Sequence, residues 1–190
     1  MNAPPARSLL WGWSLLAVLA LALAGVFAIL LVLARAPVTS DAIAWPVAFF
    51  KKALVVHVVL SFVVWYLAVM GALVELRADG RGRTPGCWGL GLAVAGTVLL
   101  LLPAALDRGE PTLNNYIPMI IDPLYYAGLV FLGAGVLVQT ARLFPGLAGA
   151  ARSGEAPDLA LAAAGLLYVA AMAGVAFAAV ELSGEDPSHD

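Results

Sequence analysis

Five long stretches without a charged residue alternate with shorter polar segments along the chain. The uncharged stretches are residues 8–34, 53–74, 84–106, 123–141 and 159–180. A helix rises about 1.5 Å per residue, so each stretch is close to the length needed to cross roughly 30 Å of hydrocarbon. The pattern predicts an all-α fold, a single-domain integral membrane bundle of five transmembrane helices. We expect these helices at about residues 8–34, 49–76, 87–106, 123–143 and 159–181, followed by an acidic tail at 182–190.

Proline, glycine and small residues indicate where helices end and where they pack. Pro103 is expected to kink or end the third helix, and Asp122 with Pro123 is typical of an N-cap and a first helical residue. Glycines in the third helix, and the alanine and glycine of the fifth, predict close contact with neighbouring helices. Residues 116–121 are apolar but too short to span, so we expect them to lie at the interface or fold back over the bundle.

Composition supports a membrane protein and excludes other classes. Of the 190 residues, 63% are hydrophobic and 12% charged, and the mean hydropathy is +0.96. A net charge of −2 is too small to indicate a nucleic-acid partner. One cysteine, Cys87, excludes an intrachain disulfide, and we expect it to be a small buried residue. The first apolar stretch is too long for a signal peptide and is interpreted as a membrane helix.

Interface residues and basic residues predict the orientation. Trp11 and Trp13 are expected at the headgroup level, and Lys51 and Lys52 are expected to mark the opposite interface. With a cytoplasmic N-terminus, the cytoplasmic side would hold Arg7, Arg77, Arg81, Arg83, Arg142 and Arg152, and the outer side Arg35, Lys51, Lys52 and Arg108. The bias, set by the basic loop after the second helix, favours a cytoplasmic N-terminus and a C-terminus outside. We expect the membrane to be a bacterial inner membrane.

His57 lies inside the second predicted helix, only about 8 Å along the axis from Lys52. Steps of three and four residues place it on one helical stripe of small and polar residues. The stripe is Ala53, His57, Ser61, Val64, Ala68, Gly71 and Glu75. An ionisable group at membrane depth needs a partner that lipid does not supply, so this stripe should face protein.

Two roles for His57 follow from its position. A neutral imidazole is a good metal ligand, and haem iron is commonly held by histidine on membrane helices. Ser61 would then leave room for the flat macrocycle, and Trp65 and Phe62 could wall it. The alternative is a structural histidine that hydrogen-bonds to a backbone or hydroxyl group on another helix.

The segment FFKKALVVHVVLSFVVWYLAVMGALVELR resembles the second helix of subunit I of the haem-copper oxidases, and NNYIPMIIDPLYYAGLVF is loosely similar to a segment that joins helices there. The resemblance covers about residues 9–143. It implies that His57 is an axial ligand of a low-spin haem b, near the outer end of its helix. The family's second axial histidine, copper ligands and cross-linked tyrosine lie on later helices, and this chain does not have them.

The second ligand of such a haem has several possible sources. It could come from a partner subunit or from His57 of a second copy, or the haem could have no second ligand. A weak methionine ligand is another option, from Met70, Met119 or Met172. His189, in the acidic tail, is interpreted as incidental.

Other polar residues have an ordinary interpretation and a functional alternative. Glu75 is about 27 Å from His57 along the helix and is expected to be solvated, with proton entry as the alternative. Asp122 is expected to cap a helix, with outward proton release as the alternative. Asn114, Asn115 and Tyr116 are expected to form a turn, although they could orient a propionate or a quinone headgroup.

The sequence therefore predicts a small inner-membrane subunit or accessory protein of a respiratory, oxidase-like complex. His57, Ser61 and Trp65 are its candidate cofactor-binding residues, with His57 as the metal ligand and haem b as the cofactor. No catalytic residue is assigned, and the chain is expected at most to transfer electrons. Its expected partners are the lipid bilayer and other membrane subunits or a second copy. The alternative is a cofactor-free structural or assembly subunit.

Overall fold

The structure is a computed structural model that describes residues 5–37, 47–77, 82–112, 118–146, 149, 152, 154 and 156–183. Its long helices are α1 (Pro5–Arg35), α5 (Arg83–Ala105), α6 (Pro123–Ala141) and α8 (Ala156–Ser183). A further long helix is divided into α3 (Val47–Val58), the π-helical segment η1 (Val59–Val64) and α4 (Trp65–Arg77). The short elements are the strands β1 (Glu110–Thr112) and β2 (Met119–Ile121) and the 3-10 turn η2 (Phe144–Gly146). The predicted all-α class and the positions of the first four helices are confirmed, within a few residues at each end.

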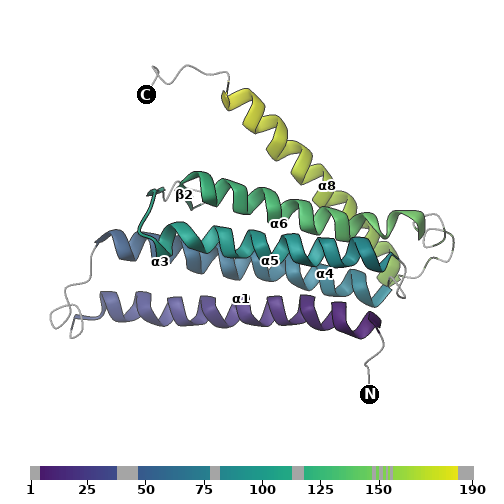
Figure 1. The fold of residues 1–190 in the computed structure, drawn as a ribbon, viewed down its shortest axis with the longest axis horizontal. Coiled ribbons are helices and arrows are strands. Elements are labelled where there is room, and N and C mark those ends of the chain that lie inside the picture. The colour runs from purple at the N-terminus through teal and green to yellow at the C-terminus, as the bar shows by residue number, and fades with distance from the viewer. Residues whose placement is uncertain are drawn as a thin grey trace.

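Helix α1, the divided helix, α5 and α6 lie side by side, and α8 tilts away from α6 (Figure 1). Of the helices that the structure describes, four are long and apolar enough to cross a membrane, which is typical of a membrane protein. They are Ser8–Arg35, Phe49–Arg77, Arg83–Ala105 and Pro123–Gly146. Within α8 the described apolar run is the shorter Leu159–Ala173.

Close packing of α5 on α6 depends on glycines that allow the two backbones to approach. A Cβ added at Gly96 would lie 2.3 Å from the backbone nitrogen of Leu132, and one added at Gly135 would lie 2.6 Å from the carbonyl oxygen of Gly89. No side chain fits at such distances, so these positions require glycine. The expectation that glycines in this helix allow close contact is confirmed for Gly89 and Gly96. Gly91, by contrast, faces open space.

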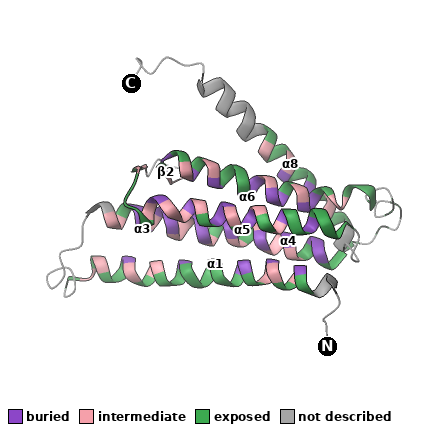
Figure 2. Ribbon diagram, viewed as in Figure 1, coloured by how far each residue is buried: buried purple, intermediate pink, exposed green. Residues whose placement is uncertain are grey.

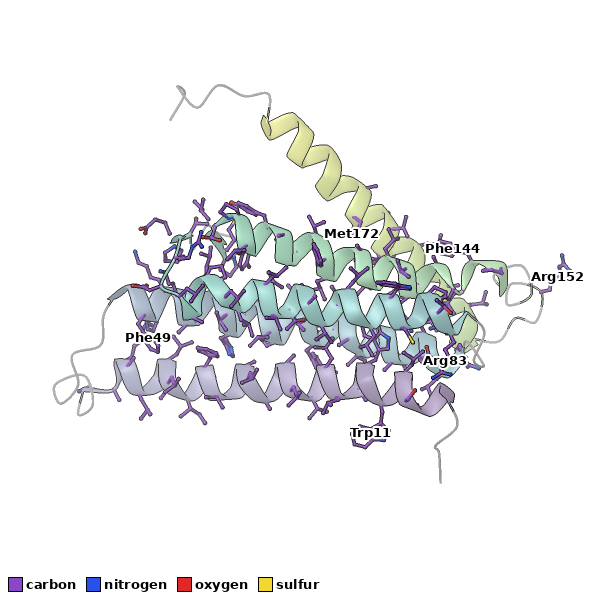
Figure 3. All side chains as sticks on the ribbon, in the orientation of Figure 1. Trp11, Phe49, Arg83, Phe144, Arg152 and Met172 are labelled. Carbon is purple, nitrogen blue, oxygen red and sulfur yellow. The ribbon has the colours of Figure 1, made fainter. Side chains whose placement is uncertain are left out.

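The core lies between α1 and the divided helix and extends to α5 and α6 (Figure 2). Trp13 is fully buried and its ring packs on Gly71 of α4, where an added Cβ would lie 2.4 Å from the ring. Trp11 is 69% exposed and points away from the bundle (Figure 3). Of the two tryptophans, Trp13 is therefore the one that turns into the bundle, because the missing side chain of Gly71 leaves space for its ring.

The end of the bundle near β1 and β2 is closed by a short hairpin. Strands β1 and β2 pair antiparallel, and Ile120 of β2 is fully buried in the core. This part of residues 116–121 folds back over the bundle, as expected. Asp122 accepts a hydrogen bond from the Leu124 backbone N–H at 2.8 Å and so caps α6, and Pro103 lies in the last turn of α5; both predictions are confirmed.

The packing prediction for Cys87 is wrong, and the prediction of close contact for α8 is confirmed only on the side that faces α6. Cys87 was expected to be buried, but it is exposed. The described part of α8 is mostly exposed and contacts the bundle along one narrow line. On this line Gly165 lies against Thr140, and the Tyr168 hydroxyl donates to the Gly133 carbonyl at 2.6 Å. Small residues permit close packing on any side of a helix, but only one side of α8 has a neighbour here.

Candidate functional site

His57 lies one residue before the end of α3, at the interface with α1. Its Nδ1 is 2.9 Å from the backbone carbonyl oxygen of Ala24 in α1. A carbonyl only accepts hydrogen bonds, so Nδ1 carries a proton and donates it. In the neutral ring this leaves the lone pair on Nε2, which is the atom that could bind a metal.

The hydrogen bond of Ser61 and the ring contact of Trp65 lie within the divided helix itself. The Ser61 hydroxyl donates to the His57 backbone carbonyl at 2.7 Å, so its proton is used inside the helix. Trp65 packs edge-on against Tyr66, with ring centroids 4.6 Å apart. Phe62 is 64% exposed, so the expectation that it walls a macrocycle against the bundle is wrong.

The π-helical segment η1 explains why the predicted stripe is only partly correct. Each π-turn contains about one residue more than an α-turn, so the faces before and after η1 are rotated relative to each other. His57 and Ser61 of the stripe are half-buried, whereas its other members are buried: Ala53, Val64, Ala68, Gly71 and Glu75. The sequence contains no proline or glycine within η1 that would have indicated the extra residue.

The hydrogen bond of His57 to Ala24 leaves one ring nitrogen for a ligand. Histidines that bind metals usually donate their other ring N–H to a carbonyl or carboxylate, and the bond to Ala24 has this form. Met172 lies against Gly133 of α6 and Met119 belongs to β2, so both are on elements other than the interface of α1 and α3. Among the residues that the structure describes, no group of three or more His, Cys, Asp or Glu could hold a metal ion.

A second polar site, which the sequence did not predict, lies at the other end of the divided helix. Glu75 accepts hydrogen bonds at Oε2 from Arg142 Nη1 at 2.5 Å and from Gln139 Nε2 at 3.2 Å. Gln139 Nε2 also donates to the Gly71 carbonyl at 3.0 Å, and its Oε1 accepts from Arg142 at 2.9 Å. The side chains of Glu75 and Arg142 are only 1% and 5% exposed. The expectation of a solvated Glu75 is wrong.

The helix ends explain how this ion pair becomes buried. Arg142 is the C-cap residue of α6, and its side chain lies against Gly86 in the first turn of α5. Gln139 was a detectable signal, because it is an uncharged amide within an otherwise apolar helix and needs a partner there. Within the described chain, Glu75 Oε1 and Trp13 Nε1 are buried without a hydrogen-bond partner.

Two further ion pairs lie at the hairpin end. Lys52 Nζ is 2.7 Å from Asp107 Oδ1, and Arg108 Nε is 3.3 Å from Asp122 Oδ2. Lys51 is exposed as expected for an interface residue, whereas Lys52 is buried and reaches Asp107 with its ammonium group. The candidates Asn114, Asn115, Tyr116 and His189 lie outside the described residues.

These observations define a helical bundle with four membrane-length helices, a half-buried histidine and a buried ion pair. No family model matches the chain, and no solved structure matches it. An uncharacterized protein of Aquifex aeolicus (strain VF5) is 30% identical to it over 137 residues, which are 70% of this chain and 33% of that protein. The chain thus spans about a third of the length of this relative.

Proposed function

We propose that the chain is a small subunit or accessory protein of a respiratory, oxidase-like complex in a bacterial inner membrane. In this proposal it is similar to a shortened subunit I of the haem-copper oxidases, and His57 binds haem b through Nε2. The observation that carries the proposal is the hydrogen bond from Nδ1 to the Ala24 carbonyl, because it orients the ring and leaves Nε2 as the ligand atom. Haem b would supply one-electron transfer to a partner subunit.

The proposed topology has five transmembrane helices, with the N-terminus in the cytoplasm and the C-terminus outside. α8 would be the fifth. Its exposed leucines support a lipid or protein neighbour: Leu166 is 56% exposed and Leu167 is 71% exposed. A second axial ligand for the haem would come from another subunit or from a second copy of the chain.

A cofactor-free structural subunit is the second candidate. The same hydrogen bond supports it, because donation to Ala24 satisfies the N–H of His57 and ties α3 to α1 without any metal. In this case the histidine stabilises the bundle, and the exposed apolar faces contact lipid or a larger complex.

Reduced-minus-oxidised absorption spectra of the protein purified in mild detergent test the proposal. We expect a Soret band and an α band in the wild type and in His189→Ala, which removes the other histidine of the chain. We expect both bands to be lost in His57→Ala and partly restored when imidazole is added to that variant. A colourless wild type, or bands that survive in His57→Ala, would contradict haem binding at this residue.

A further inference from the structure

Two pockets meet at the ion pair of Lys52 and Asp107. The first has a volume of about 530 Å³ and is walled by apolar side chains of α1, α3 and α5, among them Phe27, Phe49 and Leu101. Figure 3 shows Phe49 on the side of α3 that faces α1. The second has a volume of about 470 Å³ and is bounded by residues around the hairpin. Since Lys52 and Asp107 line both pockets, an elongated molecule could extend from one into the other.

Lys52 is held in place at this junction. Its side chain is 9% exposed, so the aliphatic stem is buried against the apolar wall while the ammonium reaches Asp107 at 2.7 Å. Asp107 ends the turn after α5 with a φ of 50°, and its side chain is 86% exposed. An ammonium has three donors, and the contact with Asp107 uses one of them, so Lys52 can also donate to a ligand.

The charges around the second pocket exclude a simple anion as the preferred ligand. Lys52 contributes one positive charge, and Asp107 and Glu110 contribute two negative charges. Arg108, the neighbouring cation of this turn, pairs with Asp122. An anionic head group would therefore be repelled by the net charge of −1 of this pocket. A zwitterionic head group can instead pair its negative group with Lys52 and its positive group with a carboxylate.

We propose that these two pockets form a binding site for phosphatidylethanolamine. One acyl chain occupies the apolar pocket, the phosphate accepts from Lys52, and the primary ammonium donates to Asp107 or Glu110. Charge-assisted bonds of this kind are stronger than neutral ones, and they require N–H groups on the lipid. Phosphatidylcholine has no such N–H group, and phosphatidylglycerol has no positive charge.

Native mass spectrometry of the full chain in detergent, titrated with lipids that share palmitoyl and oleoyl chains, tests the site. We expect phosphatidylethanolamine to bind at least about tenfold more tightly than phosphatidylcholine or phosphatidylglycerol. Lys52→Gln and Glu110→Gln should each remove most of this preference. Lys51→Gln, the same change at the exposed neighbouring lysine, should keep it.

Two further measurements separate the parts of the site. Ala105→Phe fills the exposed rim of the apolar pocket and should weaken the binding of all three lipids. Glycerophosphoethanolamine, which lacks acyl chains, should not bind. Equal binding of the three lipids, or preference for phosphatidylglycerol, would overturn the proposal. The site goes beyond haem binding and is independent of it, so His57→Ala should retain the lipid preference whatever its spectrum shows.

Discussion

Replacing Arg142 with alanine should destabilise the protein strongly, because it leaves the Glu75 carboxylate buried without a cation. Glu75 accepts at Oε2 from Arg142 and from Gln139, and its other carboxylate oxygen has no partner. After the substitution only Gln139 would donate to the carboxylate. Glu75→Ala is the reciprocal change and leaves the guanidinium of Arg142 with only the Gln139 oxygen among these contacts.

The burial of the pair sets the expected size of the effect. Exposed ion pairs contribute about 0–1 kcal/mol, whereas removal of one partner from a buried pair costs about 3–5 kcal/mol. The two side chains are 5% and 1% exposed, so the larger figure applies. We expect Arg142→Ala to lower the free energy of unfolding by about 3–5 kcal/mol. Arg83→Ala is the control, because it removes the same charge from an exposed position at the same end of the bundle. It should change the free energy of unfolding by less than about 1 kcal/mol.

The double variant tests whether the two residues act on each other. When both Glu75 and Arg142 are alanine, no buried charge is left without a partner. The double variant should therefore lose less stability than the sum of the two single variants, by about 2–3 kcal/mol. The apolar pair Glu75→Leu with Arg142→Met should recover most of the wild-type stability, because it also refills the space.

Reversible unfolding in mixed micelles with increasing dodecyl sulfate, followed by far-ultraviolet circular dichroism, measures these differences. The reasoning would be refuted by a loss of less than about 1 kcal/mol in Arg142→Ala, the size of an exposed pair. It would also be refuted if the two single losses were additive in the double variant, because residues in contact should be coupled.

Three further substitutions test the packing, each measured by the same unfolding assay. Gly96→Ala should destabilise the protein by more than about 1 kcal/mol because its Cβ would overlap the α6 backbone, whereas Gly91→Ala should have no such cost. Equal effects of the two substitutions would contradict the close approach of α5 and α6. Trp13→Ala should cost about 3–5 kcal/mol and Trp11→Ala less than about 1 kcal/mol, and the reverse order would place the wrong tryptophan in the core. Asp122→Ala should cost about 1 kcal/mol or more through loss of the cap, and Asp122→Asn should cost less; no difference between the two would argue against capping.

The sequence by itself determined the helices and their ends. An apolar segment long enough to span a bilayer must satisfy its backbone hydrogen bonds internally, and only a helix does this within one segment. The effect of Pro103 on α5 and the start of α6 at Asp122 and Pro123 were predictable because they depend on neighbouring residues alone. The glycines of α5 marked it as a helix of close contact, but the structure was needed to show that Gly96 makes this contact and Gly91 does not.

Only the tertiary structure decided which faces turn inward and which polar groups meet. Lipid and protein core both accept apolar side chains, so the sequence of such a helix carries little contrast between its two sides. This is why the sequence did not show that Trp13 is buried and Trp11 exposed, and why Cys87 is exposed, contrary to expectation. The π-helical segment after His57 then rotated one half of the helix relative to the other, and the contact of Glu75 with Arg142 joined residues 67 positions apart. Such pairings depend on how helices are placed in space, which local sequence does not encode.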